Sequence, residues 1–386
     1  MRKTLVVGFA LASLVPQAAL ACGGLFCSNS PVNQNAERVL FIKSAGRETT
    51  AVVQIQAQGN DPNFAWVVPL DAIPHDIHEE PSGMFNQLDF TTSPRYQFFN
   101  GLSAGVGLSG GGGCGFSASD ASPTAAPGGS DEARSVMVWA SGETSNFHFD
   151  VVSADDPRGL FTWLNANSYR TPEEANPIIA EYVSEHKFFI AFRLHSPAGV
   201  PNFLVSPVAF TYAGNAPCVP IRLTRIATAP TLPILTYVLS DQRAVPINFA
   251  QTTVADAEVA RLGPQRFNAQ VYDQLVGQAI SEAGGRGWIT EFAGPLPDGV
   301  RESLSTALQA ALPPAPYLTR MYTTVDARNM DRDPEFAFSR GLPDVSNVHD
   351  VSRFMTRSQV LDGRYLLLGV ALAGLCRAAL RRRARA

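Results

Sequence analysis

Positive charge is scarce in the long middle of this sequence. Residues 1–21 hold two basic residues and residues 364–386 hold six, and neither end contains an acid. The middle, 22–363, is left with 22 basic residues against all 34 acids, a net charge of −12. A surface this acidic repels phosphates, so we expect no nucleic-acid partner. Nor do we expect disorder, because 45% of all residues are hydrophobic and only 17% are charged.

Long apolar runs are also missing from the two ends. Each end has one uncharged and mostly apolar stretch of only twelve residues, 4–15 and 365–376. The first follows two basic residues and leads into Pro16 and an A-x-A sequence that ends at Ala21. This order is typical of a secretory signal peptide. We therefore predict that residues 1–21 are removed on export, with a buried N-terminal helix as the alternative.

Lipid attachment at Cys22 is an alternative outcome of export. Cys22 directly follows the predicted cleavage site. A lipid-attachment box places a larger aliphatic residue three positions before its cysteine and a small residue two positions before it. Ala19 and Leu20 stand in the reverse order, so we favour plain cleavage over a lipoprotein.

The second stretch, 365–376, reaches only about 18 Å as a helix, whereas the hydrocarbon core of a bilayer is about 30 Å thick. It continues past Arg377 to Leu380 and ends in a cluster of arginines. We predict that residues 364–386 form a short membrane anchor whose arginines stay in the cytoplasm. Residues 22–363 then lie in the periplasm or at the cell surface. A helix of the folded domain and a processed C-terminal sorting tail are the alternatives.

Cysteine is sparse, and the absence of any C-x-x-C pair argues against a zinc site. Apart from Cys376 in the tail, four cysteines remain in the part that we expect to be exported, where disulfides persist. Four cysteines allow three pairings. We favour Cys22–Cys27 together with Cys114–Cys218, and the other pairings remain open.

The middle contains strand-like and helix-like runs in blocks. Strands are predicted where β-branched and aromatic residues dominate short runs, and helices where apolar residues recur along one face after a capping residue. The predicted strands are 38–43 and 49–56, which we expect to form a hairpin, and 63–70, 135–140, 147–153, 188–194, 205–212, 219–226, 235–239, 245–249 and 288–292. The predicted helices are 81–90, 158–167, 171–186, 265–282 and 302–311. Because strands and helices do not alternate strictly, we predict an α+β fold with a largely antiparallel sheet.

Glycine, serine, alanine and proline dominate residues 100–130, which we interpret as a flexible loop inside the exported domain. The loop matches the patterns G-x-S-x-G and G-x-G-x-x-G. Both motifs require a strand before them and a helix after them, and no helix is expected here. We therefore assign it no nucleophile and no dinucleotide site.

One dense cluster of possible metal ligands stands out at residues 75–80. On a helix, His75, His78 and Glu79 share one face at i, i+3 and i+4, a spacing that suits a divalent metal. Prolines bracket the cluster, and a solvated acidic loop is the alternative.

A group of acids near the C-terminus is a candidate calcium site. The group comprises Asp326, Asp331, Asp333 and Glu335. It lacks the D-x-D-x-D-G frame of a calcium loop, so we favour a polar surface turn.

His148 and Asp150 lie on one face of a predicted strand, because side chains alternate with a period of two. Such a pair is able to act as an acid and a base. We favour a structural hydrogen bond instead.

Several motifs together resemble a known family. The sequences ACGGLFC at 21–27 and NQNAER at 33–38 are similar to the opening of bacterial domain of unknown function family 2330. Further similar motifs stand at 64–69, 152–156, 220–224 and 344–349. The resemblance spans nearly all of the middle and implies an exported bacterial protein. It implies no particular activity.

No convincing catalytic constellation emerges, so whether the protein is an enzyme stays open. Our leading hypothesis is a binding or structural module at the cell envelope that needs no cofactor. Its expected partners are the membrane, through the C-terminal tail, and an envelope protein or ligand. The rival is a periplasmic metal-assisted hydrolase that uses His75, His78 and Glu79 with a divalent metal. A substrate-translocation partner in a membrane assembly is a further alternative.

Overall fold

The computed structural model describes residues 25–27, 33–44, 46–58, 64–99, 102–105, 135–169, 171–194, 202–214, 216–226 and 228–356. The predicted signal peptide, the C-terminal anchor and most of the predicted flexible loop lie outside these ranges. Among the residues inside them, no helix is long and apolar enough to cross a membrane.

Nineteen strands are present in the described ranges, together with seven α-helices and several short 3-10 helices. The strands are β1 (Leu25–Cys27), β2 (Asn33–Lys43), β3 (Glu48–Gln58), β4 (Phe64–Leu70), β5 (His75–Glu79), β6 (Arg95–Phe99), β7 (Leu102–Gly105), β8 (Val136–Glu143), β9 (Phe147–Ala154), β10 (Phe188–Leu194), β11 (Asn202–Leu204), β12 (Val208–Ala213), β13 (Thr231–Ser240), β14 (Arg243–Pro246), β15 (Ala250–Thr252), β16 (Gly287–Pro295), β17 (Tyr317–Asp326), β18 (Phe336–Ser339) and β19 (Val348–Asp350). The helices are α1 (Gly83–Thr92), α2 (Pro157–Ala166), α3 (Asn176–Ser184), α4 (Asp256–Leu262), α5 (Ala269–Glu282), α6 (Val300–Ser303) and α7 (Thr306–Ala311). The 3-10 helices are η2 (Glu173–Ala175), η3 (Thr224–Ile226), η4 (Ala327–Asn329) and η5 (Ser352–Phe354).

A nine-stranded sheet forms the centre of the molecule. Its strand order is β15-β16-β17-β13-β2-β3-β12-β5, with β11 paired to β3 beside this path. The predicted hairpin of β2 and β3 is confirmed, and Val39 lies opposite Val53. Strands β13 and β2 pair in parallel although they are far apart in the sequence. The other pairs in this sheet are antiparallel, apart from β15 with β16.

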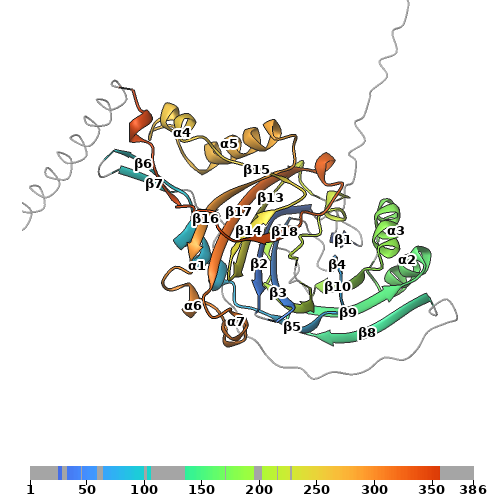
Figure 1. Cartoon of the computed structure of the whole chain (residues 1–386). Coiled ribbons are helices and arrows are strands. Elements are labelled where there is room, and N and C mark those ends of the chain that lie inside the picture. The colour runs from blue at the N-terminus through green and yellow to red at the C-terminus, as the bar shows by residue number, and fades with distance from the viewer. Residues whose placement is uncertain are drawn as a thin grey trace, which may run out of the picture.

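A five-stranded antiparallel sheet with the order β1-β4-β10-β9-β8 lies against one face of the large sheet (Figure 1). Alternate side chains of both sheets point inward and form a continuous apolar core. Val39 and Val53 from the large sheet meet Trp66 and Phe192 from the small one. The rings of Trp66 and Phe192 stack with their centroids 5.1 Å apart.

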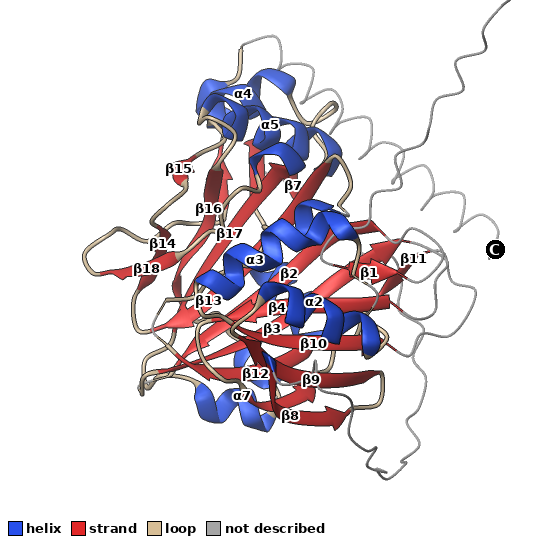
Figure 2. Cartoon of the chain, turned by 90° about the vertical axis from the view of Figure 1, so that its right-hand side faces the viewer, coloured by secondary structure: helices blue, strands red, loops and turns tan. Residues whose placement is uncertain are grey.

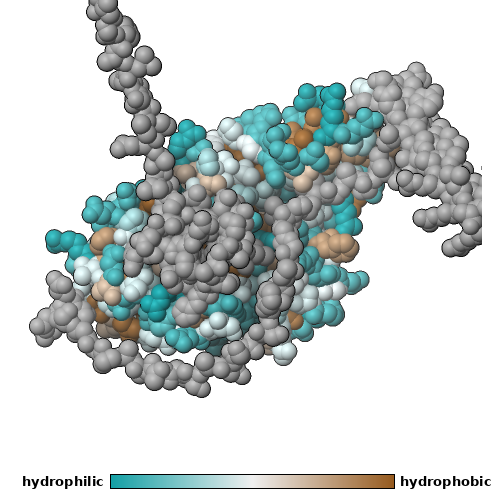
Figure 3. Space-filling model, turned by 180° about the vertical axis from the view of Figure 1, so that it is seen from behind, coloured by the Kyte–Doolittle hydropathy of each residue, from teal (hydrophilic) through white to brown (hydrophobic). Residues whose placement is uncertain are grey.

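Helices cover the two outer faces of this sandwich (Figures 1 and 2). Helices α2 and α3 bury Leu160 and Ile179 against Phe189 of the small sheet. The other helices pack on the outer face of the large sheet, around Tyr237 and Tyr272. The predicted α+β class is therefore confirmed. Seen from behind, the described surface is mostly hydrophilic, with small apolar spots (Figure 3).

Local sequence explains where the best-predicted helix begins. The side chain of Asp156 accepts hydrogen bonds from the main-chain nitrogens of Arg158 and Gly159, at 3.4 and 3.0 Å, and Pro157 fills the first turn. An aspartate cap followed by proline satisfies free N–H groups of the first turn. The predicted helix at this position is thus confirmed.

The predicted strand at 219–226 is wrong. The chain here forms turns and η3 instead. The main-chain nitrogens of Ile221 and Arg222 donate to the carboxylate of Asp333, at 2.8 and 3.0 Å, and so have no strand partner. The carboxylate of Asp333, which is distant in sequence, accepts the main-chain N–H groups that a β-ladder would need.

Candidate functional site

The three predicted metal ligands lie on a strand, so the helical spacing that would gather them is not observed. Strand β5 (His75–Glu79) forms an edge of the large sheet and pairs with β12. His75 contacts Asp76 at 3.0 Å and Glu48 at 3.2 Å. Burial lowers the pKa of His75, but the hydrogen bonds and charges of Asp76 and Glu48 outweigh it and raise this pKa above its usual value.

The other two members of this cluster are engaged elsewhere. His78 lies 3.0 Å from the carboxylate of Glu80. Glu79 accepts hydrogen bonds from the main-chain and side-chain nitrogens of Asn146, at 2.7 and 2.6 Å, and from the hydroxyl of Thr144. Among the described residues, no group of three His, Cys, Asp or Glu side chains is arranged to hold a metal. The geometry therefore gives the metal-assisted hydrolase no support.

His148 and Asp150 do lie together on β9, with the His148 Nε2 atom 3.2 Å from the carboxylate. The same carboxylate accepts a 2.7 Å hydrogen bond from the buried hydroxyl of Tyr169 and another from Ser141 on β8. Burial, together with the charge of Asp150, raises the pKa of Tyr169 far above its usual value. Asp150 thus ties neighbouring elements together, as the structural interpretation predicts.

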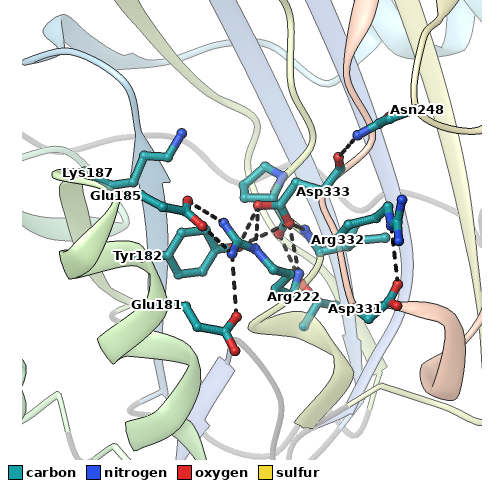
Figure 4. Close-up of polar contacts among 12 residues, drawn as sticks. Glu181, Tyr182, Glu185, Lys187, Arg222, Asn248, Asp331, Arg332 and Asp333 are labelled. Atoms are coloured by element: carbon teal, nitrogen blue, oxygen red, sulfur yellow. Dashed lines mark hydrogen bonds and ion pairs between the residues drawn. The ribbon is translucent and has the colours of Figure 1, made fainter.

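Three of the acids considered as calcium ligands, Asp326, Asp331 and Asp333, face an arginine or main-chain donors. Asp326 binds Arg328, whose hydrogen bonds lower the pKa of the carboxyl to about 2. Asp331 forms a two-pronged pair with Arg286, at 2.6 and 2.9 Å. Asp333 lies in a separate network (Figure 4). These carboxylates do not converge, so the surface-turn interpretation fits better than a calcium site.

Asp333 is the centre of a clamp that the sequence patterns do not reveal. Its carboxylate accepts hydrogen bonds from the hydroxyl of Tyr182 at 2.8 Å and from the Nε atom of Arg222 at 3.0 Å, besides the two main-chain nitrogens described above (Figure 4). Arg222 also makes two 2.7 Å hydrogen bonds to Glu185, the residue that follows α3. These bonds hold the pKa of Glu185 below its usual value. The clamp joins α3, the segment after β12 and the segment before β18.

A narrow cavity lies between the two sheets, next to the segment that the clamp holds. Apolar side chains of β2, β3, β4 and β12 line most of it, and Glu37 and Cys218 add polar groups. Its volume is about 20 Å³, which is room for about one water molecule. Burial raises the pKa of Glu37 to about 7, although a 2.8 Å hydrogen bond from Gln34 lowers it in part.

The predicted disulfide cysteines are only partly described. Cys218 forms no disulfide with another described residue, and burial raises the pKa of its thiol well above its usual value. Its predicted partner, Cys114, and the other predicted pair member Cys22 lie outside the described ranges, and only the backbone of Cys27 is described. Both pairings therefore stay predictions.

A second network, also not foreseen, is centred on Arg320 of β17, which is only 2% exposed. Its guanidinium donates to Glu291 at 2.6 Å, to Asp89 at 2.7 Å and to the hydroxyl of Tyr237 at 2.8 Å. Tyr272 of α5 donates to the second oxygen of Glu291 at 2.6 Å. A buried arginine with several good acceptors is a satisfied structural group.

The clearest candidate for a functional surface is β8, the outer strand of the small sheet. Within the described part of the chain β8 has a strand partner on one side only. Met137, Val138 and Trp139 are 56%, 46% and 45% exposed. A shift in register lies between Val138 and Ala140, so Trp139 is the extra residue of a bulge. The run was predicted as a strand, but only the sheet order shows that it is an edge.

Trp139 is exposed but held in place. Its Nε1 atom donates to the hydroxyl of Ser153 at 2.9 Å, and its ring meets Phe188 edge-on with centroids 5.9 Å apart. The turn between β8 and β9 is fastened to β5 by Glu79, as described above. The edge is therefore a rigid apolar surface with outward-facing main-chain groups.

Comparison with known proteins adds a family but no activity. A family model described as an uncharacterized protein conserved in bacteria (DUF2330) matches residues 16–337. Among solved structures, baculovirus P35 is similar at 11% identity and a TM-score of 0.29, over 57% of this chain and 76% of that one. A mutated baculovirus P35 after caspase cleavage is similar at 9% identity and a TM-score of 0.27, over 55% and 77%. Likeness at this level carries no argument. No curated protein matches.

Proposed function

This chain belongs to the DUF2330 family of bacterial proteins, and from that premise we propose that it is an exported binding module of the cell envelope. Residues 1–21 direct export, and residues 364–386 hold the protein at the membrane. The module takes an extended apolar segment of another envelope protein at the outer edge of β8. The observation that carries the proposal is the run of three exposed apolar residues on this strand, which has no strand partner on its outer side among the described residues.

An unpaired edge strand offers a row of N–H and C=O groups that another strand can complete. Natural proteins usually protect such edges with lysine, proline, very short strands or a bulge. Strand β8 has eight residues and carries no charge before Glu143, so the bulge at Trp139 is its only such device. Strand addition of this kind takes affinity from main-chain hydrogen bonds and specificity from side chains.

The chemistry of the edge suits a neutral and apolar partner strand. Met137 and Trp139 flank Val138, and a partner strand would cover all three. Trp139 is already ordered by Ser153 and Phe188, so it loses little conformational freedom on binding. Rigid, partly buried tryptophans are frequent anchors of interfaces.

Photo-crosslinking in the native host tests the binding site. A photoreactive residue in place of the exposed Ala140 is expected to give a defined adduct with one partner. Met137→Lys and Val138→Lys should abolish this adduct, because lysine blocks an edge. Gln274→Lys on α5 is the matched control and should leave it intact. An adduct that survives both edge variants, or that Gln274→Lys also abolishes, would contradict the proposal.

The mature mass of the native protein tests the cellular location. Loss of residues 1–21, a retained tail and recovery in the membrane fraction are expected. A soluble chain that keeps Met1 would contradict the proposed export and anchoring. The proposed binding site at β8 would then be tested by the crosslinking experiment alone.

A further inference from the structure

A second group of exposed apolar residues lies far from β8, where the described chain ends. Phe90 on α1 is 73% exposed and Val348 on β19 is 42% exposed. Arg95 joins them, because it pairs with Val348 in the parallel ladder of β19 and β6 and donates to the carbonyl of Phe90 at 2.7 Å. Its guanidinium carbon lies 5.8 Å from the centre of the Phe90 ring.

The group continues along the chain to its last described residues. Phe354 in η5 is 44% exposed, and the guanidinium carbon of Arg353 lies 4.7 Å from the centre of its ring. Two aromatic rings, each accompanied by an arginine, thus lie in the neighbourhood of β6, which pairs with β19 and contacts η5. Strand β8 lies at the opposite end (Figures 1 and 2).

Chain length limits how far this surface can lie from the proposed anchor. The described chain ends at Thr356, and the apolar stretch begins at Tyr365. Eight residues, 357–364, separate the two. A fully extended chain spans at most about 3.3–3.6 Å per residue, so eight residues reach no more than about 29 Å. Whatever the path of this linker, the surface around Phe354 is tethered close to the bilayer.

We propose that this surface lies against a bilayer that contains anionic phospholipids. The surface consists of Phe90, Val348 and Phe354 with Arg95 and Arg353. The proposal rests on the membrane attachment proposed above. Aromatic side chains favour the interfacial region of a bilayer. Arginines near the surface are attracted to anionic headgroups and bind phosphate oxygens in a fork. This orientation points the edge of β8 away from the membrane, where a partner can reach it.

Fluorescence quenching in vesicles tests the orientation. The full chain with its tail is reconstituted into phosphatidylethanolamine–phosphatidylglycerol vesicles whose acyl chains carry bromine. Phe354→Trp places a reporter in the surface, and Ile247→Trp, at a residue that is 56% exposed and outside this surface, is the matched control. Subtracting the parent protein removes the signal of the four native tryptophans. The added fluorescence of Phe354→Trp should fall at least twofold, and that of Ile247→Trp should not change.

The outcomes separate this inference from the anchoring on which it rests. Arg95→Glu with Arg353→Glu should reduce the quenching of the Phe354→Trp reporter while the protein still floats with the vesicles. Flotation without quenching at position 354 overturns the orientation and leaves the anchor intact. A full chain that does not float with vesicles overturns both.

Discussion

The carboxylate of Glu79 on the large sheet accepts hydrogen bonds from both the main-chain and the side-chain nitrogen of Asn146 in the turn of the small sheet. The sequence pattern suggests that Glu79 is a metal ligand, but in the structure it fastens the two sheets to each other. Because Asn146 follows β8 in the same hairpin, this contact also sets the position of the proposed binding edge.

Glu79→Ala is therefore expected to lower the free energy of unfolding by about 2 kcal/mol, since hydrogen bonds to a charged group contribute about 1.5–3 kcal/mol each and part of the loss is recovered from water. Urea unfolding of the full chain measures it. Asp76→Asn on the same strand is the control, because the side chain of Asp76 pairs with exposed His75 and the change should alter stability by less than about 0.5 kcal/mol. If the two changes lowered the free energy of unfolding equally, Glu79 would not fasten the two sheets to each other.

Asp333→Asn is expected to cost about 3 kcal/mol or more. The change removes the charge that Arg222 faces and turns one acceptor oxygen into a donor, opposite either the two main-chain nitrogens or the Nε atom of Arg222. Asp331→Asn disturbs a partly exposed ion pair with Arg286 and should cost less than about 1 kcal/mol. Chemical unfolding compares the two variants. A stable Asp333→Asn protein would contradict the role of the clamp.

Glu37 should make the protein less stable as pH rises. Its folded pKa is about 7, above its usual value of 4.5, so between these values the folded state holds a proton that the unfolded state has lost. The stabilisation is fully present below pH 4.5 and is lost as pH passes through 7. The loss amounts to roughly 3 kcal/mol, since one pKa unit corresponds to about 1.4 kcal/mol.

Glu37→Gln removes this titration. Unfolding measured at pH 5 and at pH 8 should show a variant that is more stable than the parent at the higher pH and similar to it at the lower one. If the variant and the parent differ in free energy of unfolding by the same amount at both pH values, Glu37 does not titrate in this range.

Arg320→Met should be the most damaging of these substitutions. It leaves the buried carboxylates of Asp89 and Glu291 side by side without their counter-charge, at an expected cost of about 3–5 kcal/mol. Where the methionine variant does not fold, Arg320→Lys provides the measurement, because lysine keeps the charge but loses the planar fork of donors. Its melting temperature should fall clearly below that of the parent. Parent-like melting of either variant would contradict the argument.

The central strand β17 shows why part of the fold escapes sequence patterns. Three polar residues of this strand are buried at 0–2% exposure, namely Thr319, Arg320 and Thr323. Because they occupy buried positions, the sequence does not show the alternation of apolar and polar residues that identifies a strand. Their polar atoms have partners from other elements, such as the carbonyl of Gly287 for Thr323 at 2.6 Å. Those partners are distant in sequence, so no local pattern reveals that the positions are buried.

The candidate sites follow the same rule. Spacing on a helix groups His75, His78 and Glu79, whereas the strand that forms turns them toward separate partners. The edge at Met137–Trp139 reads locally as an ordinary strand. Its exposure depends on which strand lies at the end of the sheet, and this is a property of the sheet order.

Local chemistry was enough for the hairpin of β2 and β3, for the cap at Asp156 and for the α+β class, because each depends on neighbouring residues or on composition. Only the tertiary structure paired β13 with β2, closed Asp333 onto Arg222 and left β8 at an edge. These features join residues that are far apart along the chain. Their energies come from burial and from matched donors and acceptors that exist only after the sheets have assembled.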